Sequence, residues 1–188
     1  MTRIYFVRHA QPEHSYKDDR TRPLTNEGSN DSNMVLETLK DKEIDIFYCS
    51  PYKRSMDTIK KTADFYGKSI LTDERFRERE CGENGIIQGM IQKRWENRDY
   101  HEDSGESLNM VQKRNIEALI EVLEKYRDKN IVIGTHGTAL STILNYYNPQ
   151  FKFNDFMRII DWMPYVIEVD FEGKNFVCII ELAHIEKN

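Results

Sequence analysis

The sequence predicts a three-layer α/β/α sandwich with a mostly parallel central sheet and an antiparallel edge. Short apolar runs alternate with helical patterns over most of the chain, which is the order that strand, helix, strand units of a parallel sheet produce. Two of these runs, residues 3–7 and 130–134, are apolar almost throughout, as expected of buried strands. The last two runs flank a short polar turn, which predicts a closing antiparallel hairpin.

The N-terminal part begins with the strand at residues 3–7 and continues into a polar loop at residues 11–23. Thr25 is a residue type that caps helices well, and the apolar positions of the helix expected after it gather in its second half. A strand at residues 44–49 completes the first strand, helix, strand unit.

A second helix follows this strand directly. We expect Ser50 to be its N-cap and Pro51 its first residue, because both residue types are favoured at those positions. Apolar residues at three- and four-residue steps carry the helix to Gly67, a residue type suited to the position after a helix end. Residues 70–72 are expected to form a short third strand.

The stretch at residues 73–105 is charged and contains several glycines, so we expect a substrate loop or lid there, with one short helix at residues 90–95. The longest helix opens at residues 104–107 and runs to Tyr126. Glu106 is expected in its first turn, where a carboxylate suits the helix dipole.

The C-terminal part contains the strand at residues 130–134, a helix at residues 138–146, and the two hairpin strands at residues 165–171 and 176–182. No repeat, linker or low-complexity segment interrupts the pattern, so residues 1–188 are expected to form a single domain.

The overall composition is that of a soluble globular protein, with 39% hydrophobic and 31% charged residues. No apolar run approaches the roughly 20 residues that a membrane span needs, and no signal-like segment opens the chain, so we expect a cytoplasmic protein without a membrane partner. The net charge of −5 argues against a nucleic-acid partner but leaves small anionic substrates open. The oligomeric state is left open.

The three cysteines, Cys49, Cys81 and Cys178, lack the spacing of a disulfide framework or a zinc knuckle. A cysteine-dependent phosphatase would need five residues between its cysteine and arginine, whereas Cys49 and Arg54 leave only four. His9, His14 and His136 lack adjacent aspartates, and two arginines would repel metal cations, so a binuclear metal centre is not expected.

Histidines follow two of the predicted strands at the point where each strand ends. Arg8 and His9 follow the first strand, and His136, succeeded by Gly137, follows the strand at residues 130–134. Because ligands bind at the carboxyl ends of the strands in open α/β sheets, we expect both rings at one crevice. Arg54, in the first turn of a helix, could share an anion with that helix terminus.

Acidic residues close to a glycine complete the set of candidate site residues. The stretch Arg75-Phe76-Arg77-Glu78-Arg79-Glu80-Cys81-Gly82 supplies two carboxylates, and its arginines are interpreted as a solvated or ion-paired face. Two histidines, two arginines and an acid suit phosphoryl transfer, because guanidinium forks match phosphate oxygens and stabilise the charge of the transferred group.

Five segments, in this order along the chain, resemble the histidine phosphatase superfamily, which has the phosphoglycerate mutase-like fold: Val7-Arg8-His9-Ala10, Ser50-Pro51-Tyr52-Lys53-Arg54, Arg75 to Gly82, Gly105-Glu106-Ser107 and Thr135-His136-Gly137. The resemblance implies that His9 attacks phosphorus to form a phosphohistidine, that Arg8, Arg54 and His136 hold the phosphoryl oxygens, and that Glu78 protonates the leaving oxygen. It implies no metal and no cofactor.

His9 must attack as the neutral imidazole, and the cations Arg8 and Arg54 are expected to lower its pKa. Spacing alone does not choose between Glu78 and Glu80, which share a face of an extended chain; the resemblance favours Glu78.

The chain also departs from the family pattern, most clearly in the polar segment at residues 83–85, which bears on the substrate. The short chain favours a phosphatase acting on a small phosphorylated metabolite. Phosphoglycerate mutase-type transfer and a phosphate-binding regulatory protein remain the alternatives.

Overall fold

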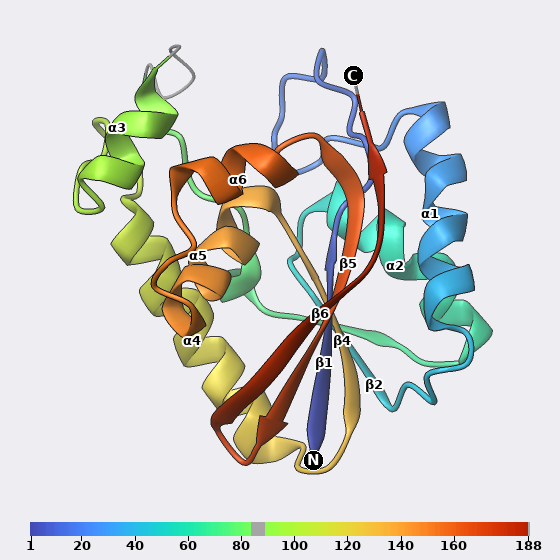
Figure 1. The fold of residues 1–188 in the computed structure, drawn as a ribbon. Helices are drawn as coiled ribbons and strands as arrows, with labels where there is room; N and C mark the ends of the chain where they lie inside the picture. Colours follow the sequence, from blue (N-terminus) through green and yellow to red (C-terminus); the bar gives the residue numbers. More distant parts are fainter. Residues whose placement is uncertain (84–88, 188) are drawn as a thin grey trace.

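The computed structural model describes residues 1–83 and 89–187 and contains one six-stranded sheet with helices on both faces (Figure 1). The strands are β1 (Thr2–Arg8), β2 (Ile46–Cys49), β3 (Ile70–Thr72), β4 (Asn130–Thr135), β5 (Trp162–Glu172) and β6 (Asn175–Glu186). The helices are α1 (Asn26–Leu39), α2 (Lys53–Phe65), α3 (Met90–Glu96), α4 (Leu108–Lys125), α5 (Gly137–Tyr147) and α6 (Phe153–Ile159), with a short 3-10 helix, η1 (Glu74–Phe76).

The sheet has the strand order β3-β2-β4-β1-β5-β6. The first four of these strands run parallel, whereas β5 is antiparallel to β1 and β6 is antiparallel to β5. The predicted fold, including the antiparallel edge and the closing hairpin, is therefore confirmed.

Strand β1 lies between β4 and β5, and side chains on both of its faces are buried. Ile4 and Phe6 belong to one apolar core, together with α4 and α5 residues such as Leu119 and Leu140. The alternate residues Tyr5 and Val7 belong to a second core beneath α1 and α2. The period of two along the strand thus divides its side chains between two cores, which makes three layers (Figure 1).

Two predicted helix starts are wrong, and in each case a side chain has another partner. Helix α2 begins at Lys53, because the Ser50 hydroxyl accepts a hydrogen bond from the Tyr52 amide at 3.2 Å and closes a turn before the helix. Helix α4 is capped by Ser107, so Glu106 precedes the helix and contacts Arg114.

Other local predictions are confirmed. The Thr25 hydroxyl accepts a hydrogen bond from the Gly28 amide at 2.9 Å and caps α1. Gly67 follows α2 with a φ of 62°, a left-handed conformation that favours glycine. The short helix expected at residues 90–95 is α3.

Helix α6 is absent from the predicted elements. Its Phe153, Phe156 and Met157 have helical spacing, and the Asp155 carboxylate accepts the Lys152 amide at 2.9 Å at its start. The helix packs against α3 above the ends of the central strands (Figure 1).

Within the described residues, no helix is both long and apolar enough to cross a membrane. Part of the expected substrate loop, residues 84–88, lies outside the described residues, so the prediction for the polar segment at 83–85 is not tested there.

Candidate functional site

The candidate site lies at the carboxyl ends of the two central parallel strands. Strands β1 and β4 pair so that Arg8 is opposite Thr135, and His9 and His136 are the residues that follow. Their ring centroids are 5.2 Å apart. The prediction that both histidines meet at one edge of the sheet is confirmed.

A cavity of about 670 Å³ opens at this edge. Four of the five predicted site residues line it, namely Arg8, His9, Arg54 and Glu78. The fifth, His136, is fully buried beside His9 and does not line the cavity. The structure therefore brings the predicted residues together and gives one of them a deeper position than the sequence indicated.

The imidazole of His9 has a defined orientation. Its Nδ1 lies 2.8 Å from the carbonyl oxygen of Ala10. Because a carbonyl only accepts hydrogen bonds, Nδ1 carries the proton and Nε2 keeps a free lone pair. Burial is the largest cause that lowers the pKa of His9 well below its usual value, and the cations Arg54 and Arg8 lower it further. The expected direction is confirmed, with burial ahead of the cations.

His136 is oriented by Ser50. The Ser50 hydroxyl lies 2.7 Å from Nε2 and also accepts a hydrogen bond from the Tyr52 amide. The other ring nitrogen, Nδ1, is buried and has no hydrogen-bond partner among the described residues. Burial, followed by the Arg54 cation, lowers the pKa of His136 well below its usual value.

Arg8 is a buried cation at the base of the cavity. Its Nη1 donates to the carbonyl oxygen of Ile159 at 2.6 Å, while its Nε has no hydrogen-bond partner among the described residues. Burial lowers its pKa to about 10, and the carboxylates of Glu78 and Asp161 oppose this shift, so it stays charged near neutral pH. A Cβ on Gly137 would lie 3.1 Å from the Arg8 guanidinium carbon, which explains the glycine after His136.

Arg54 lies in the first turn of α2, as predicted, and only 3% of it is exposed. Its Nη1 donates to the carbonyl oxygen of Asp19 at 2.6 Å and to the Asp19 carboxylate at 3.1 Å. Its guanidinium carbon is also 5.0 Å from the centre of the Tyr52 ring. These contacts fix the guanidinium beside the cavity and connect it to the loop after β1.

Glu78 and Glu80 have different surroundings. The Glu78 carboxylate accepts the amides of Thr138 and Ala139, at 3.0 and 3.1 Å, and so sits at the N-terminus of α5. Glu80 is exposed and pairs with Arg77. Both line the cavity, but only Glu78 is fixed next to the strand end that carries His136.

The arginines of the same stretch are ion-paired, as predicted. Arg75 contacts Asp73 and Glu121, and Arg77 contacts Glu80 and Glu106. Arg79 is buried and pairs with Glu102 at 3.2 Å.

Sequence reasoning did not identify several residues that shape the cavity. Asp19 positions Arg54, Tyr52 packs between Arg54 and His136, and Asp161 adds a carboxylate near Arg8. The Thr58 hydroxyl accepts the Ala10 amide at 2.9 Å and fixes the backbone after His9. The sequence contained a signal for Thr58, because a residue four positions after Arg54 lies on the same face of the helix.

The structure gives the cysteines no reactive setting in the site. Burial raises the pKa of the Cys49 thiol to about 12, and burial also raises the pKa of Cys81, which lines the cavity. In the described ranges, no group of three or more histidine, cysteine, aspartate or glutamate side chains is arranged to hold a metal ion.

The chain is similar to several known proteins. The model of the histidine phosphatase superfamily (branch 1) matches residues 4–178. A putative phosphoserine phosphatase 2 from Hydrogenobacter thermophilus is 28% identical over 77% of this chain and 77% of its own length. A 2,3-bisphosphoglycerate-dependent phosphoglycerate mutase from Thermoplasma acidophilum is 30% identical over 66% of this chain and 62% of its own length.

Among solved structures, phosphoserine phosphatase from Entamoeba histolytica in complex with 3-phosphoglyceric acid has a TM-score of 0.78 and 19% identity, and the match covers 100% of this chain and 98% of that one. At this identity, the likeness is one of fold.

Proposed function

The chain belongs to the histidine phosphatase superfamily, and from that premise we propose that it hydrolyses small phosphomonoesters through a phosphohistidine formed on His9. The observation that carries the proposal is a neutral imidazole with a free Nε2 lone pair, located in one cavity with two buried guanidinium groups. A neutral imidazole is the form that attacks phosphorus, and the guanidinium groups match the charge of the transferred group.

In the first step, the Nε2 lone pair of His9 attacks phosphorus and the bond from phosphorus to the ester oxygen breaks. Glu78 gives a proton to the departing oxygen, so that a neutral alcohol leaves. Arg8 and Arg54 line the cavity and hold the phosphoryl oxygens. His136 is assigned to the same group of oxygens from its buried position beside His9, with the two ring centroids 5.2 Å apart.

In the second step, water attacks the phosphohistidine. The Glu78 carboxylate takes a proton from this water, the bond between nitrogen and phosphorus breaks, and inorganic phosphate leaves with the His9 lone pair restored. Protein side chains supply every proton transfer in this scheme.

The substrate is a small phosphorylated metabolite in this proposal. The relatives named phosphoserine phosphatase and phosphoglycerate mutase support that class. A cytoplasmic location and the absence of a nucleic-acid partner stay predictions from the sequence.

The test is phosphate release from a panel of phosphomonoesters by the wild-type protein and by His9→Ala. We expect stoichiometric release by the wild type and none above background by the variant. Turnover that survives His9→Ala would contradict the proposal.

The mutase alternative is kept because several relatives carry that name, the one from Thermoplasma acidophilum among them. It predicts transfer of the phosphoryl group to a second substrate oxygen without free phosphate. The same assay, with the organic products quantified, separates the two reactions.

A further inference from the structure

We call the cavity of about 670 Å³ that contains His9 and Arg54 the phosphate cavity. A second cavity, of about 450 Å³, lies next to it and shares a wall with it. The shared residues are Glu78, Arg79 and Cys81. Its volume is within the range of about 300–1,000 Å³ that small-molecule sites usually have. The scheme proposed above assigns no role to this second cavity.

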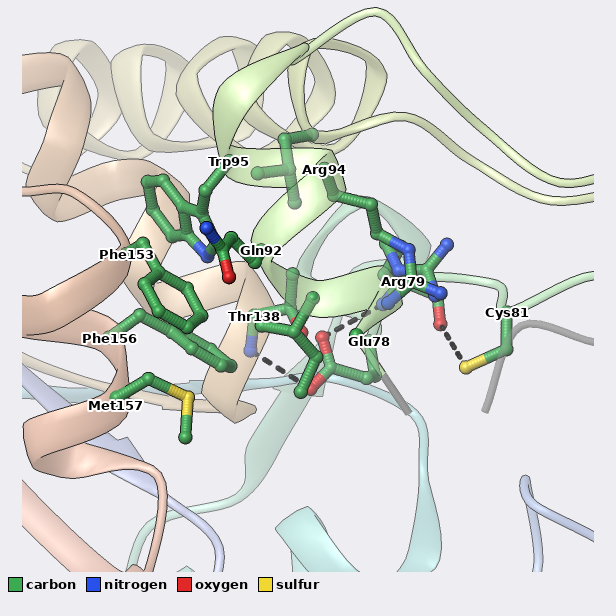
Figure 2. A pocket seen from close by; sticks show the side chains of 13 residues that line it. Glu78, Arg79, Cys81, Gln92, Arg94, Trp95, Thr138, Phe153, Phe156 and Met157 are labelled. Carbon is green, nitrogen blue, oxygen red and sulfur yellow. Dashed lines mark hydrogen bonds between the residues drawn. The ribbon is translucent and has the colours of Figure 1, made fainter. Parts of the chain in front are cut away.

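One side of this second cavity is an aromatic and aliphatic wall (Figure 2). Trp95 of α3 and Phe153, Phe156 and Met157 of α6 stand together on this side, opposite Arg79 and Cys81 (Figure 2). The Trp95 and Phe156 ring centroids are 5.8 Å apart, so α3 and α6 hold the wall together. Met157 is 40% exposed, so this wall presents apolar surface at the edge of the cavity.

The positive charges on the opposite side are already paired. Arg79 donates to Glu102 at 3.2 Å, and Arg94 donates from Nε to the same carboxylate at 3.0 Å. All three side chains are buried. Because this carboxylate lies between the two guanidinium groups, the cavity offers an entering group an apolar surface more than a charged one.

The position of Glu78 connects the two cavities to the proposed reaction. In-line attack by His9 expels the ester oxygen on the far side of phosphorus, and the acid that protonates this oxygen must lie beside it. Glu78 lines both cavities, so a leaving group whose oxygen reaches Glu78 continues into the second cavity.

We propose that the second cavity binds the leaving group and that the preferred substrates are phosphomonoesters of apolar or aromatic alcohols. This inference rests on the proposed function. The wall made by Trp95, Phe153, Phe156 and Met157 contacts the leaving group and so determines which esters are preferred. The phosphate cavity binds the phosphoryl group, which is the same in every ester.

The test compares 2-phenylethyl phosphate with ethyl phosphate. Both are esters of primary alcohols, so the comparison isolates contact with the wall from leaving-group chemistry. We expect kcat/KM to be at least about tenfold higher for the phenylethyl ester, since apolar groups of this size contribute that much discrimination in a pocket. Phosphoserine, whose leaving group is charged, is expected to fall with ethyl phosphate or below it.

Variants place the preference in the second cavity. Met157→Glu introduces a carboxylate into the wall and is expected to bring the ratio of the two kcat/KM values close to one. Met110→Glu is the matched control, because Met110 is a similarly exposed methionine, at 49%, and does not line the cavity. It is expected to keep the wild-type ratio. Phe153→Ala, at a half-buried position, is a second wall variant if Met157→Glu fails to fold.

A binding measurement separates this inference from the proposed function. Calorimetry with 2-phenylethylphosphonate and ethylphosphonate needs no turnover, and we expect tighter binding of the phenylethyl compound to the wild type. Preferential binding without hydrolysis of either ester would contradict the proposed function and support the apolar subsite. Equal binding of the two phosphonates, equal kcat/KM values for the two esters, or a preference that survives both wall variants would overturn the inference.

Discussion

The two buried imidazoles make the free energy of unfolding depend on pH, and the size of this dependence can be calculated. His9 and His136 are 6% and 0% exposed, and burial lowers both pKa values well below the usual value of about 6.5. In the unfolded chain both rings bind a proton once the pH falls below about 6.5. The native protein does not bind these protons until its own, lower pKa values are reached.

The sign follows from this difference. Between the two sets of pKa values the unfolded state binds more protons, so the free energy of unfolding falls as the pH falls. The stabilisation is fully present above about pH 6.5 and is lost progressively below it. Each imidazole contributes a slope that approaches about 1.36 kcal/mol per pH unit, and the pair approaches about 2.7 kcal/mol per pH unit.

Urea unfolding between about pH 7.5 and about pH 5.5 measures this slope. His9→Gln and His136→Gln are each expected to reduce it by about half, and the double variant to remove most of it. Equal slopes in the wild type and in the double variant would refute the reasoning, because the protons would then come from other groups.

Three further predictions concern single side chains. Gly137→Ala is expected to lower kcat/KM by about tenfold with little loss of stability, because the new Cβ would lie 3.1 Å from the Arg8 guanidinium carbon and displace it; unchanged kinetics would contradict this. Glu102→Gln is expected to lower the free energy of unfolding in urea by about 3 kcal/mol, because it removes a carboxylate that pairs with two buried arginines. Glu121→Gln, at an exposed ion pair, is the control and should leave that value unchanged. Arg54→Lys is expected to lower kcat by roughly tenfold to a hundredfold, because an ammonium lacks the guanidinium fork; wild-type kcat in steady-state assays would argue against a bidentate role.

The central strands could be predicted because their apolar runs leave little choice. Residues such as Phe6 and Val7 are buried on opposite faces of β1, so the whole run must be apolar. The histidines after these runs were predictable for the same reason, since parallel strands end at one edge of the sheet.

Helix starts were less predictable because capping side chains have competing partners. Ser50 is a good N-cap by type, but its hydroxyl lies 2.7 Å from His136 in the structure. The same hydroxyl also closes a local turn with the Tyr52 amide, and its contact with His136 joins residues far apart in the chain, which the sequence around Ser50 does not indicate. Helix α6, in contrast, had a signal in the spacing of Phe153, Phe156 and Met157.

The depth of His136 and the second cavity could not be predicted from the sequence. His136 is buried against His9, Ser50 and Tyr52, which come from distant parts of the chain. The second cavity depends on how α3 and α6 pack, since Trp95 and Phe156 meet only in the folded chain. The reaction type could therefore be predicted from the sequence, whereas the leaving group of the substrate could not.

The most direct test of the account is to trap the phosphoryl group on the enzyme. Acid-sensitive phosphohistidine should be preserved by a rapid alkaline quench during turnover and located by peptide mass spectrometry. The account predicts one phosphoryl group on His9 in the wild type, accumulation of the same species in Glu78→Gln with an activated ester whose leaving group needs no proton, and none in His9→Ala. A phosphoryl group on another residue, or turnover by the wild type without any phosphoenzyme, would contradict it.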